Sequence, residues 1–284
     1  MKQVRIVTDS VGDIPASLAS ELDIAVIPAQ ISFGKELYRD GVDLSPQEFL
    51  DKLAQSEELP KTAQPPVQDF ALTYQRLLEE DPGCRIVSIH VPGNLSGIVN
   101  AAWAGAQMLP DPTLVEVVDS GQISMGMGWA VVEAARLAQA GASQAEVVQA
   151  LQALLPRLRT VAMLDTLENL YKGGRISKIS AAVGSALQIK PLLGVERGEI
   201  LVLGKVRTRS RALKQLVALV SDWGTVAEMA VLHAGAEDLM HSLVEMLQAQ
   251  FPLDRMVTGL AGSALTTHLG PGAVGVCALV APDD

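Results

Sequence analysis

The sequence has few of the residues on which metal-binding, disulfide-stabilised and nucleic-acid-binding proteins depend. Its 284 residues include two cysteines and four histidines, and aromatic residues make up only 4%. Cys84 and Cys277 each lie in an apolar stretch, which predicts two buried thiols rather than a disulfide or a metal site. The net charge of -10 excludes the broad basic surface that binding to nucleic acid requires.

Segments and motifs that indicate membrane insertion, nucleotide binding or hydrolysis are also missing. No apolar run approaches the roughly 20 residues of a membrane span, and no charged-then-apolar leader opens the chain. There is no G-x-x-x-x-G-K-[ST] loop, no G-x-G-x-x-G after a strand, no G-x-S-x-G and no H-E-x-x-H. We therefore expect a cytoplasmic protein without stable membrane insertion, metal, cofactor or catalytic motif of its own.

Short apolar runs alternate with helical patterns along most of the chain. The extended runs are Val4–Val7, Ile24–Phe33, Arg85–Val91, Leu114–Val118 and Val161–Leu164, and the helical ones are Leu95–Leu109, Met127–Ala140 and Gln144–Leu158. A further helix is expected over Pro15–Leu22, opened by Asp13. This alternation predicts α/β layers with parallel strands and crossover helices.

The pattern changes near residue 157. Beyond it, two extended runs, Ile189–Val195 and Ile200–Val206, meet at Arg197-Gly198, which predicts an antiparallel hairpin. We therefore expect two domains. Residues 1–157 would form a mostly parallel sheet with flanking helices, and residues 158–284 an α/β domain with a mixed sheet.

One histidine is framed by turn residues. His268 comes just before Gly270-Pro271-Gly272, and the apolar run Val274–Val280 follows. Glycine and proline fix the backbone there, so the imidazole is expected to be held at the rim of a sheet. His90 and His241 are more simply explained as a core residue and a surface helix residue.

Two hydroxyl side chains occupy loops that precede helices. Thr62 belongs to Thr62-Ala63-Gln64-Pro65-Pro66, and Ser96 to Asn94-Leu95-Ser96-Gly97. A hydroxyl, a helix N-terminus and a histidine together would suit a carboxylate, because free N–H groups and the helix dipole favour an anion. Helix capping by Asn94 or Ser96 explains the second loop equally well.

Charged residues gather at three kinds of position. Cations flank the turn at Gly173-Gly174, and the densest basic stretch is Lys205–Arg211, in which Arg207 is a candidate anion partner. Three strands are followed by aspartate, at Asp9, Asp119 and Asp165. Capping is the simpler explanation for these aspartates, and a metal-assisted hydrolase is the alternative.

Nine short stretches, taken in order, resemble the DegV family of bacterial fatty-acid-binding proteins. They are Val7–Ser10, Tyr38–Asp43, Thr62–Pro65, Leu95–Gly97, Val118–Ser120, Gly173–Ser177, Ile189–Pro191, Gly204–Thr208 and His268–Ala273. The resemblance implies a two-domain α/β fold that binds one long-chain fatty acid in a buried tunnel between the domains.

The resemblance also implies which residues hold the carboxylate. They are Thr62, Ser96 and His268, with Arg207 as a fourth member and Gly97, Asn100, Ser120 and Gly270 in support. The family's role is to present the fatty acid to a separate ATP-dependent kinase, and the acyl phosphate then enters phospholipid synthesis. The protein would thus be a carrier without catalysis or cofactor of its own, and its oligomeric state stays open.

The chain departs from the family pattern at two positions near the expected head group. Ala63 replaces a serine and Ile98 replaces a threonine, so two hydroxyls are lost, and Asn100 could supply a polar contact instead. Residues 179–193 and Met125–Gly128 are candidate tunnel walls, although ordinary core packing explains both equally well.

A second resemblance gives a different function. DegV proteins look like relatives of the substrate-binding subunit of dihydroxyacetone kinase, which holds a ketone covalently on a histidine. Under this alternative, His268 or His233 would bind a small carbonyl compound as a nucleophile.

Overall fold

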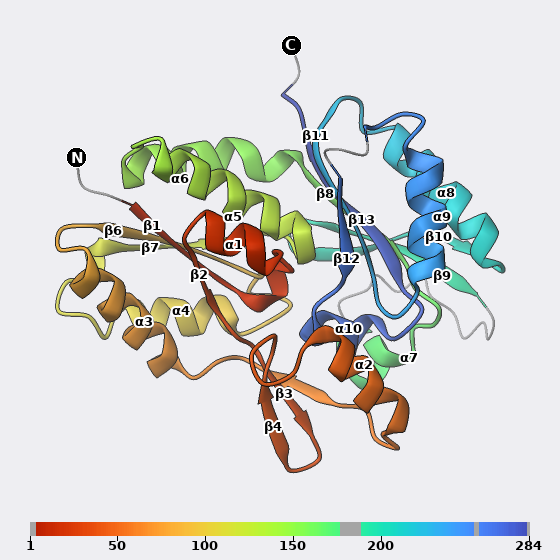
Figure 1. Cartoon of the computed structure of the whole chain (residues 1–284), viewed down its shortest axis with the longest axis horizontal. Coiled ribbons are helices and arrows are strands. Elements are labelled where there is room, and N and C mark those ends of the chain that lie inside the picture. The colour runs from red at the N-terminus through yellow and green to blue at the C-terminus, as the bar shows by residue number, and fades with distance from the viewer. Residues whose placement is uncertain (1–3, 177–188, 253–255, 283–284) are drawn as a thin grey trace.

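The computed structural model describes residues 4–176, 189–252 and 256–282, and two β-sheets with one long helix between them dominate it (Figure 1). The first sheet is parallel, in the order β2-β1-β6-β7. Its strands are β1 (Val4–Asp9), β2 (Ile24–Ile27), β6 (Arg85–His90) and β7 (Val115–Asp119). The central strands β1 and β6 are buried on both faces, as is typical of parallel sheets covered by helices.

The second sheet has six strands in the order β10-β9-β8-β13-β11-β12, and only the β11–β12 pair is parallel. The strands are β8 (Leu158–Met163), β9 (Lys190–Glu196), β10 (Glu199–Val206), β11 (Val226–His233), β12 (Met256–Leu260) and β13 (Val274–Val280). The predicted α/β class, with one parallel and one mixed sheet, is confirmed.

A small antiparallel sheet projects below the parallel one, in the order β4-β3-β5 (Figure 1). Its strands are β3 (Gln30–Phe33), β4 (Glu36–Arg39) and β5 (Lys61–Ala63). The single run predicted over Ile24–Phe33 is wrong, because the chain leaves β2 at Pro28 and starts β3 in a different sheet. In the new sheet Ile31 pairs with Thr62, which fixes the position of that threonine.

Helices cover both faces of the sheets. They are α1 (Ala16–Glu21), α2 (Pro46–Gln55), α3 (Val67–Glu80), α4 (Ile98–Ala106), α5 (Ser124–Gln139), α6 (Gln144–Leu154), α7 (Glu168–Lys172), α8 (Arg209–Ser221), α9 (Glu237–Leu247) and α10 (Ser263–Leu269), with 3-10 turns at Ser10–Gly12, Pro112–Leu114 and Leu155–Arg157. Reciprocal capping by Ser45 with Glu48 and by Ser143 with Glu146 starts α2 and α6. None of the helices in the described ranges combines the length and the apolar character that crossing a bilayer requires.

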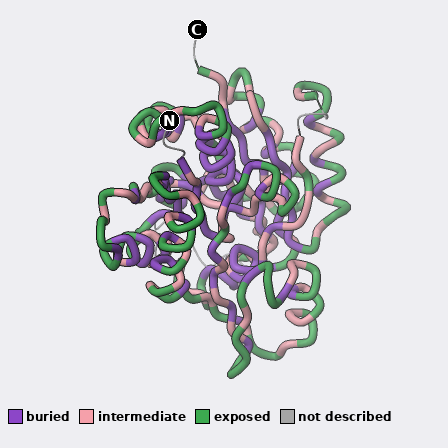
Figure 2. Tube along the Cα trace, turned by 60° about the vertical axis from the view of Figure 1, so that its left-hand side comes forward, coloured by how far each residue is buried: buried purple, intermediate pink, exposed green. Residues whose placement is uncertain are grey.

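Helix α5 belongs to the cores of both sheets. Twelve of its sixteen residues are buried, which sets it apart from an ordinary surface helix with one apolar stripe. It packs on β1 on one side and on β8 and β13 on the other, and the Trp129 Nε1–H donates to the Cys277 carbonyl oxygen across 3.3 Å. Figure 2 shows the resulting buried band through the middle of the molecule.

The predicted hairpin is confirmed, and its turn reaches the other sheet. Strands β9 and β10 are antiparallel, and Arg197 and Gly198 between them have φ of 49° and 79°, as the tight two-residue hairpin turn needs. The Gly198 N–H donates to the Gly121 carbonyl at 2.8 Å, and the Asn94 amide donates to the Gly198 carbonyl at 2.6 Å. The expected domain boundary at residue 157 stays a prediction; β8 and all later strands belong to the mixed sheet.

Asp13 does not open a helix as expected, because α1 begins at Ala16 with Pro15 in the cap position. Instead its carboxylate links the loop after β1 to α5 and to the start of α10. One oxygen accepts from the Ser124 hydroxyl at 2.7 Å and the other from the Gly262 N–H at 3.0 Å. Burial raises the pKa of Asp13 to about 7, since these two hydrogen bonds only partly offset the loss of hydration.

Replacing Asp13 with asparagine is expected to stabilise the protein more at alkaline than at acidic pH. Because the folded-state pKa lies above the unfolded value, the folded protein retains a proton that the unfolded chain releases between about pH 4 and about pH 7, and stability falls as the pH rises through this window. Thermal unfolding of both proteins at about pH 5 and about pH 8 measures the effect. An equal difference in melting temperature at the two pH values would contradict it.

Candidate functional site

Thr62, Ser96 and His268 lie around one cavity of about 200 Å3. Thr62 is on β5, Ser96 is in the loop before α4, and His268 is in the last turn of α10. The Thr62 Oγ1 and His268 Nε2 atoms are 2.8 Å apart although 206 residues separate them in the chain. The three residues that the resemblance singled out are therefore brought together, with two hydroxyls and one imidazole facing a single space.

The His268 ring is neutral near neutral pH. Burial, followed by the neighbouring Arg175 charge, lowers the pKa of His268 to about 4. Its Nδ1 is buried without a hydrogen-bond partner among the described residues, and Gly173 lies so close that a Cβ there would stand 2.6 Å from this nitrogen. An unpaired buried N–H costs more than an unpaired lone pair, so we assign the proton to Nε2, where it is donated to Thr62.

The Ser96 hydroxyl lies at the start of α4. Its Oγ accepts from the Ile98 N–H at 3.4 Å, which leaves its own proton available to another acceptor. Gly97 is the cap residue of α4 and contributes no side-chain cap, and the Gln64 side chain fills the space that a Cβ at Gly97 would need. The start of α4 and Ser96 thus border the same cavity, an arrangement that favours an anion.

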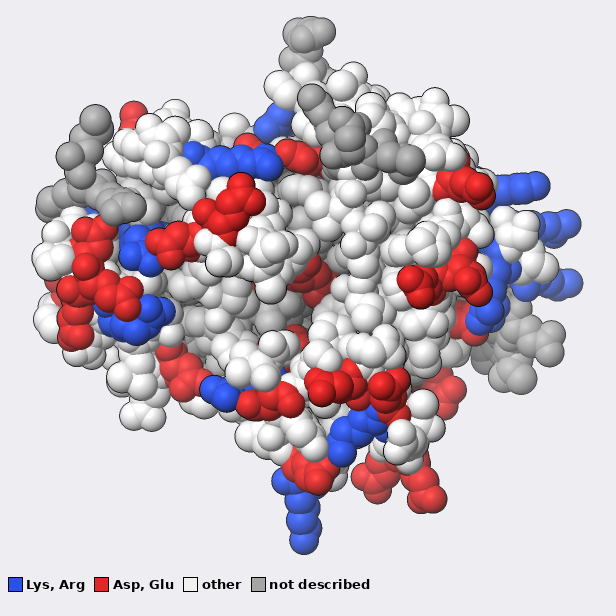
Figure 3. Space-filling view, in the orientation of Figure 1, with Lys and Arg blue, Asp and Glu red and all other residues white. Residues whose placement is uncertain are grey.

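The cation at this cavity is Arg175, not Arg207. Arg175 lines the cavity, is half-buried and donates from Nη1 to the Gly173 carbonyl at 2.8 Å. Arg207 is exposed and lies outside the cavity lining, just before α8. Figure 3 shows Lys and Arg side chains at the right-hand edge of the molecule, where Figure 1 labels α8 and β10. In the sequence, the only signal for Arg175 is its place directly after the Gly173-Gly174 turn.

Of the four supporting residues, only Gly97 lines the cavity. Asn100 is exposed on α4, and the Ser120 hydroxyl is used within its own turn, where it donates to the Gln122 carbonyl. Gly270 ends α10 with φ of 75° and lies against Asn169, whose amide donates to the Thr267 carbonyl. Asn100 therefore does not replace the hydroxyls that Ala63 and Ile98 lack. Gly270 contributes by ending α10, and not by contacting the cavity.

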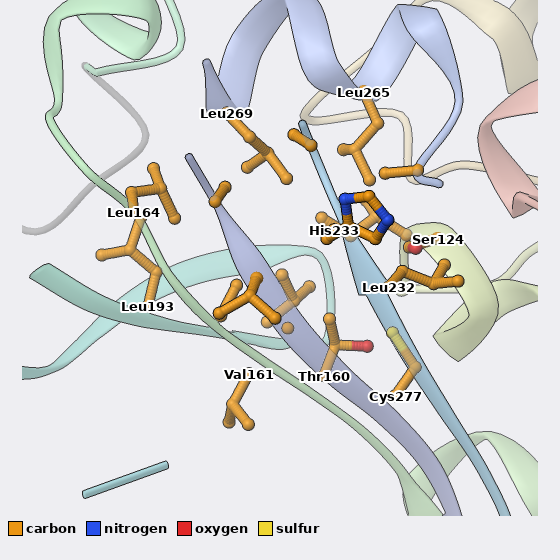
Figure 4. Close-up of a pocket in the computed structure, with 18 of the residues that line it drawn as sticks. Ser124, Thr160, Val161, Leu164, Leu193, Leu232, His233, Leu265, Leu269 and Cys277 are labelled. Atoms are coloured by element: carbon orange, nitrogen blue, oxygen red, sulfur yellow. The ribbon is translucent and has the colours of Figure 1, made fainter. Parts of the chain in front are cut away.

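A second, smaller cavity of about 60 Å3 lies next to the first, against the larger sheet. The two share five apolar lining residues, Ile123, Leu170, Ile200, Leu265 and Leu269. Figure 4 shows side chains from the mixed sheet, α5 and α10 converging on the inner cavity. The two cavities thus adjoin across these five side chains, with polar groups around the outer one and aliphatic walls around the inner one, which suits a slender amphipathic molecule.

The few polar side chains around the inner cavity make their hydrogen bonds to other parts of the protein. The Thr160 hydroxyl donates to the Gln122 side chain at 2.9 Å, and the Ser124 hydroxyl donates to Asp13 at 2.7 Å. Burial raises the pKa of the Cys277 thiol to about 11, so this sulfur stays protonated and unreactive. The inner cavity therefore offers mainly apolar contacts.

Neither histidine of the alternative function is arranged as a nucleophile. His233 lines the inner cavity, but its Nδ1 accepts the Ala236 N–H at 3.0 Å, so the neutral ring carries its proton on Nε2 and has no free lone pair. Burial lowers the pKa of His233 and keeps the ring neutral. The free Nδ1 lone pair of His268 lies against Gly173, which leaves no room for a carbonyl carbon.

The expected wall segments differ in outcome. Residues 179–188 lie outside the described part of the chain, and Leu193 of the same stretch lines the inner cavity. Met125 and Met127 are fully buried in the core around α5 and are not among the lining residues. On the α5 side, Ile123 and Ser124 form the wall instead.

The three strand-end aspartates do not meet at adjacent strand ends, as the metal alternative required. Asp9 and Asp119 follow strands of the parallel sheet, whereas Asp165 follows β8 in the mixed sheet. Asp9 accepts from the buried His90 ring at 2.9 Å, Asp119 from two backbone N–H groups, and Asp165 pairs with Lys190 and Arg209. Within the described ranges, no group of three or more candidate ligands could hold a metal ion.

Comparison with known proteins gives one consistent family. The profile of the DegV family, described as uncharacterised proteins, matches residues 3–281. DegV of Bacillus subtilis is 32% identical over 278 residues, covering 96% of this chain and 98% of the relative. The structure of DegV from Bacillus subtilis, described as a fatty acid binding protein, superposes with a TM-score of 0.89 at 30% identity and covers 99% of this chain and 100% of that one.

A second solved structure agrees. A DegV family protein from Thermus thermophilus, described for its fatty acid binding, superposes with a TM-score of 0.88 at 30% identity, covering 98% of this chain and 100% of that one.

Proposed function

Because the chain belongs to the DegV family, we propose that it is a carrier of one long-chain fatty acid, bound with its carboxylate in the outer cavity and its acyl chain in the inner one. The observation that carries this proposal is that two cavities adjoin and share five lining residues, with Thr62, Ser96 and His268 around the outer one and aliphatic walls around the inner one. Two proteins of this fold, from Bacillus subtilis and Thermus thermophilus, are each 30% identical to this chain and are described as binding fatty acids.

The head-group residues would act as a relay of donors. The His268 Nε2–H donates to Thr62 Oγ1, and this orients the Thr62 proton toward the carboxylate. Ser96 supplies a second hydroxyl, and the first turn of α4 supplies favourable partial charge. Arg175 compensates the negative charge, and hydrogen bonds to an ionised acceptor are the stronger ones. The hydroxyls missing at Ala63 and Ile98 are not needed for this arrangement.

The acyl chain would provide most of the affinity. Each methylene removed from water contributes about 0.8 kcal/mol, and the inner walls offer leucine, isoleucine, valine and alanine side chains to receive it. The inner polar groups are already hydrogen-bonded, so a hydrocarbon chain leaves none of them unpaired.

The role of the carrier would be to present the carboxylate to a separate ATP-dependent kinase in the cytoplasm. Transfer of the γ-phosphoryl group of ATP to a carboxylate oxygen gives an acyl phosphate and ADP, and the acyl phosphate would feed phospholipid synthesis. The half-buried Arg175 beside the head group would face the added phosphoryl charge. The exposed Arg207 would lie outside the head-group site and be free to contact an anionic group of the partner.

Native mass spectrometry of the freshly purified protein tests the carrier function. We expect an excess mass that corresponds to one ligand, disappears on denaturation and is identified as a long-chain fatty acid by lipid extraction. Protein that is bare and also fails to take up added stearic acid would contradict the proposal. A covalent adduct on His233 or His268 would instead support the small-carbonyl alternative.

A further inference from the structure

Helix α10 carries His268 near its end, and two carboxylates from distant parts of the chain hold its beginning. The Gly262 N–H donates to Asp13 Oδ1 at 3.0 Å, and the Ser263 N–H donates to Asp40 Oδ1 at 3.2 Å. Asp13 follows β1, and Asp40 follows β4, more than 220 residues before the helix. The start of α10 is thus fixed to the two sheets formed by the first part of the chain.

Both carboxylates are themselves held in place. Asp13 has a left-handed φ of 50°, and its second oxygen accepts from Ser124 on α5. The second oxygen of Asp40 accepts from the Ser10 hydroxyl at 2.8 Å, and the Ser10 Oγ accepts from the Ala29 N–H at 3.0 Å. These hydrogen bonds leave each aspartate little freedom to follow α10 if the helix moved.

The approach of Asp13 to α10 depends on a glycine. A Cβ at Gly262 would lie 2.6 Å from Asp13 Oδ1, so any larger residue there would push the carboxylate away from the helix. Both aspartates also border a hollow of about 630 Å3 between the sheets. Figure 3 shows acidic side chains at the floor of a central hollow. Burial raises the pKa of both carboxyl groups, so the hydrogen bonds to α10, and not an ion pair, are what hold the helix here.

We propose that Asp13 and Asp40 are positioning residues for fatty-acid binding, because they fix the start of α10 and thereby hold His268 against Thr62. This inference rests on the proposed function. A helix of seven residues has little stability of its own, so its position is set by the contacts at its ends. His268 lies five residues, about 7.5 Å, beyond Ser263, and Leu265 between them lines both cavities. The five residues that line both cavities are called the throat below. A shift of α10 would therefore move the His268 imidazole and two residues of the throat, Leu265 and Leu269, together.

Paired variants separate positioning from charge and from stability. Asp13→Ala removes the acceptor for Gly262, whereas Asp13→Asn retains an oxygen for it and an amide that can donate to Ser124. Leu216→Ala, on the buried face of α8, is the control for general destabilisation, because Leu216 belongs to a different hydrophobic cluster from the residues of α10. The readouts are the dissociation constant for stearic acid and the imidazole 15N signals of His268, which report its tautomer and its hydrogen bond to Thr62.

We expect Asp13→Ala to weaken stearic acid binding by about tenfold and to shift the His268 signals, since a buried donor is left unpaired and the helix is released. Asp13→Asn should stay close to the wild type in both readouts, and Leu216→Ala should leave the His268 signals unchanged. If Asp13→Ala does not fold, Gly262→Ala gives the same test, because it displaces the carboxylate while both aspartates remain.

Wild-type His268 signals in Asp13→Ala would overturn the inference, whatever its affinity. Failure of the wild-type protein to bind stearic acid would count against the proposed function instead, and the His268 signals would still show whether Asp13 sets the position of the ring.

Discussion

A tryptophan in place of Ile200 is expected to weaken fatty-acid binding by about a hundredfold or more. Ile200 is one of the five residues that border both cavities, and it lies on β10 at the edge of the mixed sheet. An indole there would fill the throat and keep the acyl chain out of the inner cavity. Losing the burial of only four methylenes costs about 3 kcal/mol, which corresponds to about a hundredfold in affinity.

The neighbouring residue provides a matched control. Leu201 is the next residue on the same edge strand, and it lines a separate surface hollow on the other face of the sheet. Leu201→Trp therefore introduces the same side chain into the same strand without entering the throat. Stearic acid titrations of both variants, with circular dichroism as a check on folding, measure the effect. Equal affinities for the two variants would show that the acyl chain does not pass Ile200.

The double replacement Ser96→Ala with His268→Ala is expected to weaken binding by about a hundredfold without unfolding the protein. Ser96 would donate directly to the ionised carboxylate, and His268 orients the Thr62 hydroxyl that would donate a second hydrogen bond to it. Hydrogen bonds to a charged group contribute about 1.5–3 kcal/mol each. His268 is neutral, so its removal deletes a donor and leaves no unpaired charge. The acyl chain would still bind, so the residual affinity should be measurable in the same titration.

The same two residue types on the surface serve as the control. His241 and Ser242 are adjacent and exposed on α9, away from both cavities. Replacing both with alanine should leave the dissociation constant and the melting temperature close to the wild-type values. An unchanged affinity in the Ser96→Ala, His268→Ala protein would remove the carboxylate site from these residues.

Local patterns predicted the features that depend on neighbouring residues. The hairpin at Arg197-Gly198 follows from a glycine in a turn that needs positive φ, and the α/β class follows from the alternation of strands and helices. The contact of Thr62 with His268 joins residues 206 positions apart, and only the resemblance to a family brought them together before the structure did. Composition and periodicity carry no information about such a pair.

The positions of Arg207 and Arg175 depend on different features of the chain. Arg207 stands in the densest basic stretch, but charge density along the chain favours solvated surface, and Arg207 is exposed. Arg175 is placed by the short helix α7 and the Gly173-Gly174 turn, whose position depends on packing against α10. Asp13 is similar: its spacing before Pro15 suggested a cap, and its actual partners on α5 and α10 lie far along the chain.

Helix α5, which packs on both sheets, limits how a ligand could enter and leave the protein. Moving the two sheets apart would strip α5 of one of its two apolar partners and expose side chains that are now fully buried, among them Met125, Met127 and Trp129. Exposing each such side chain costs about 1.5–3 kcal/mol, so separating the two sheets would cost nearly as much free energy as unfolding the protein. A fatty acid bound as proposed would therefore have to enter end-on, through the smaller elements that border the outer cavity, while the two sheets and α5 stay together.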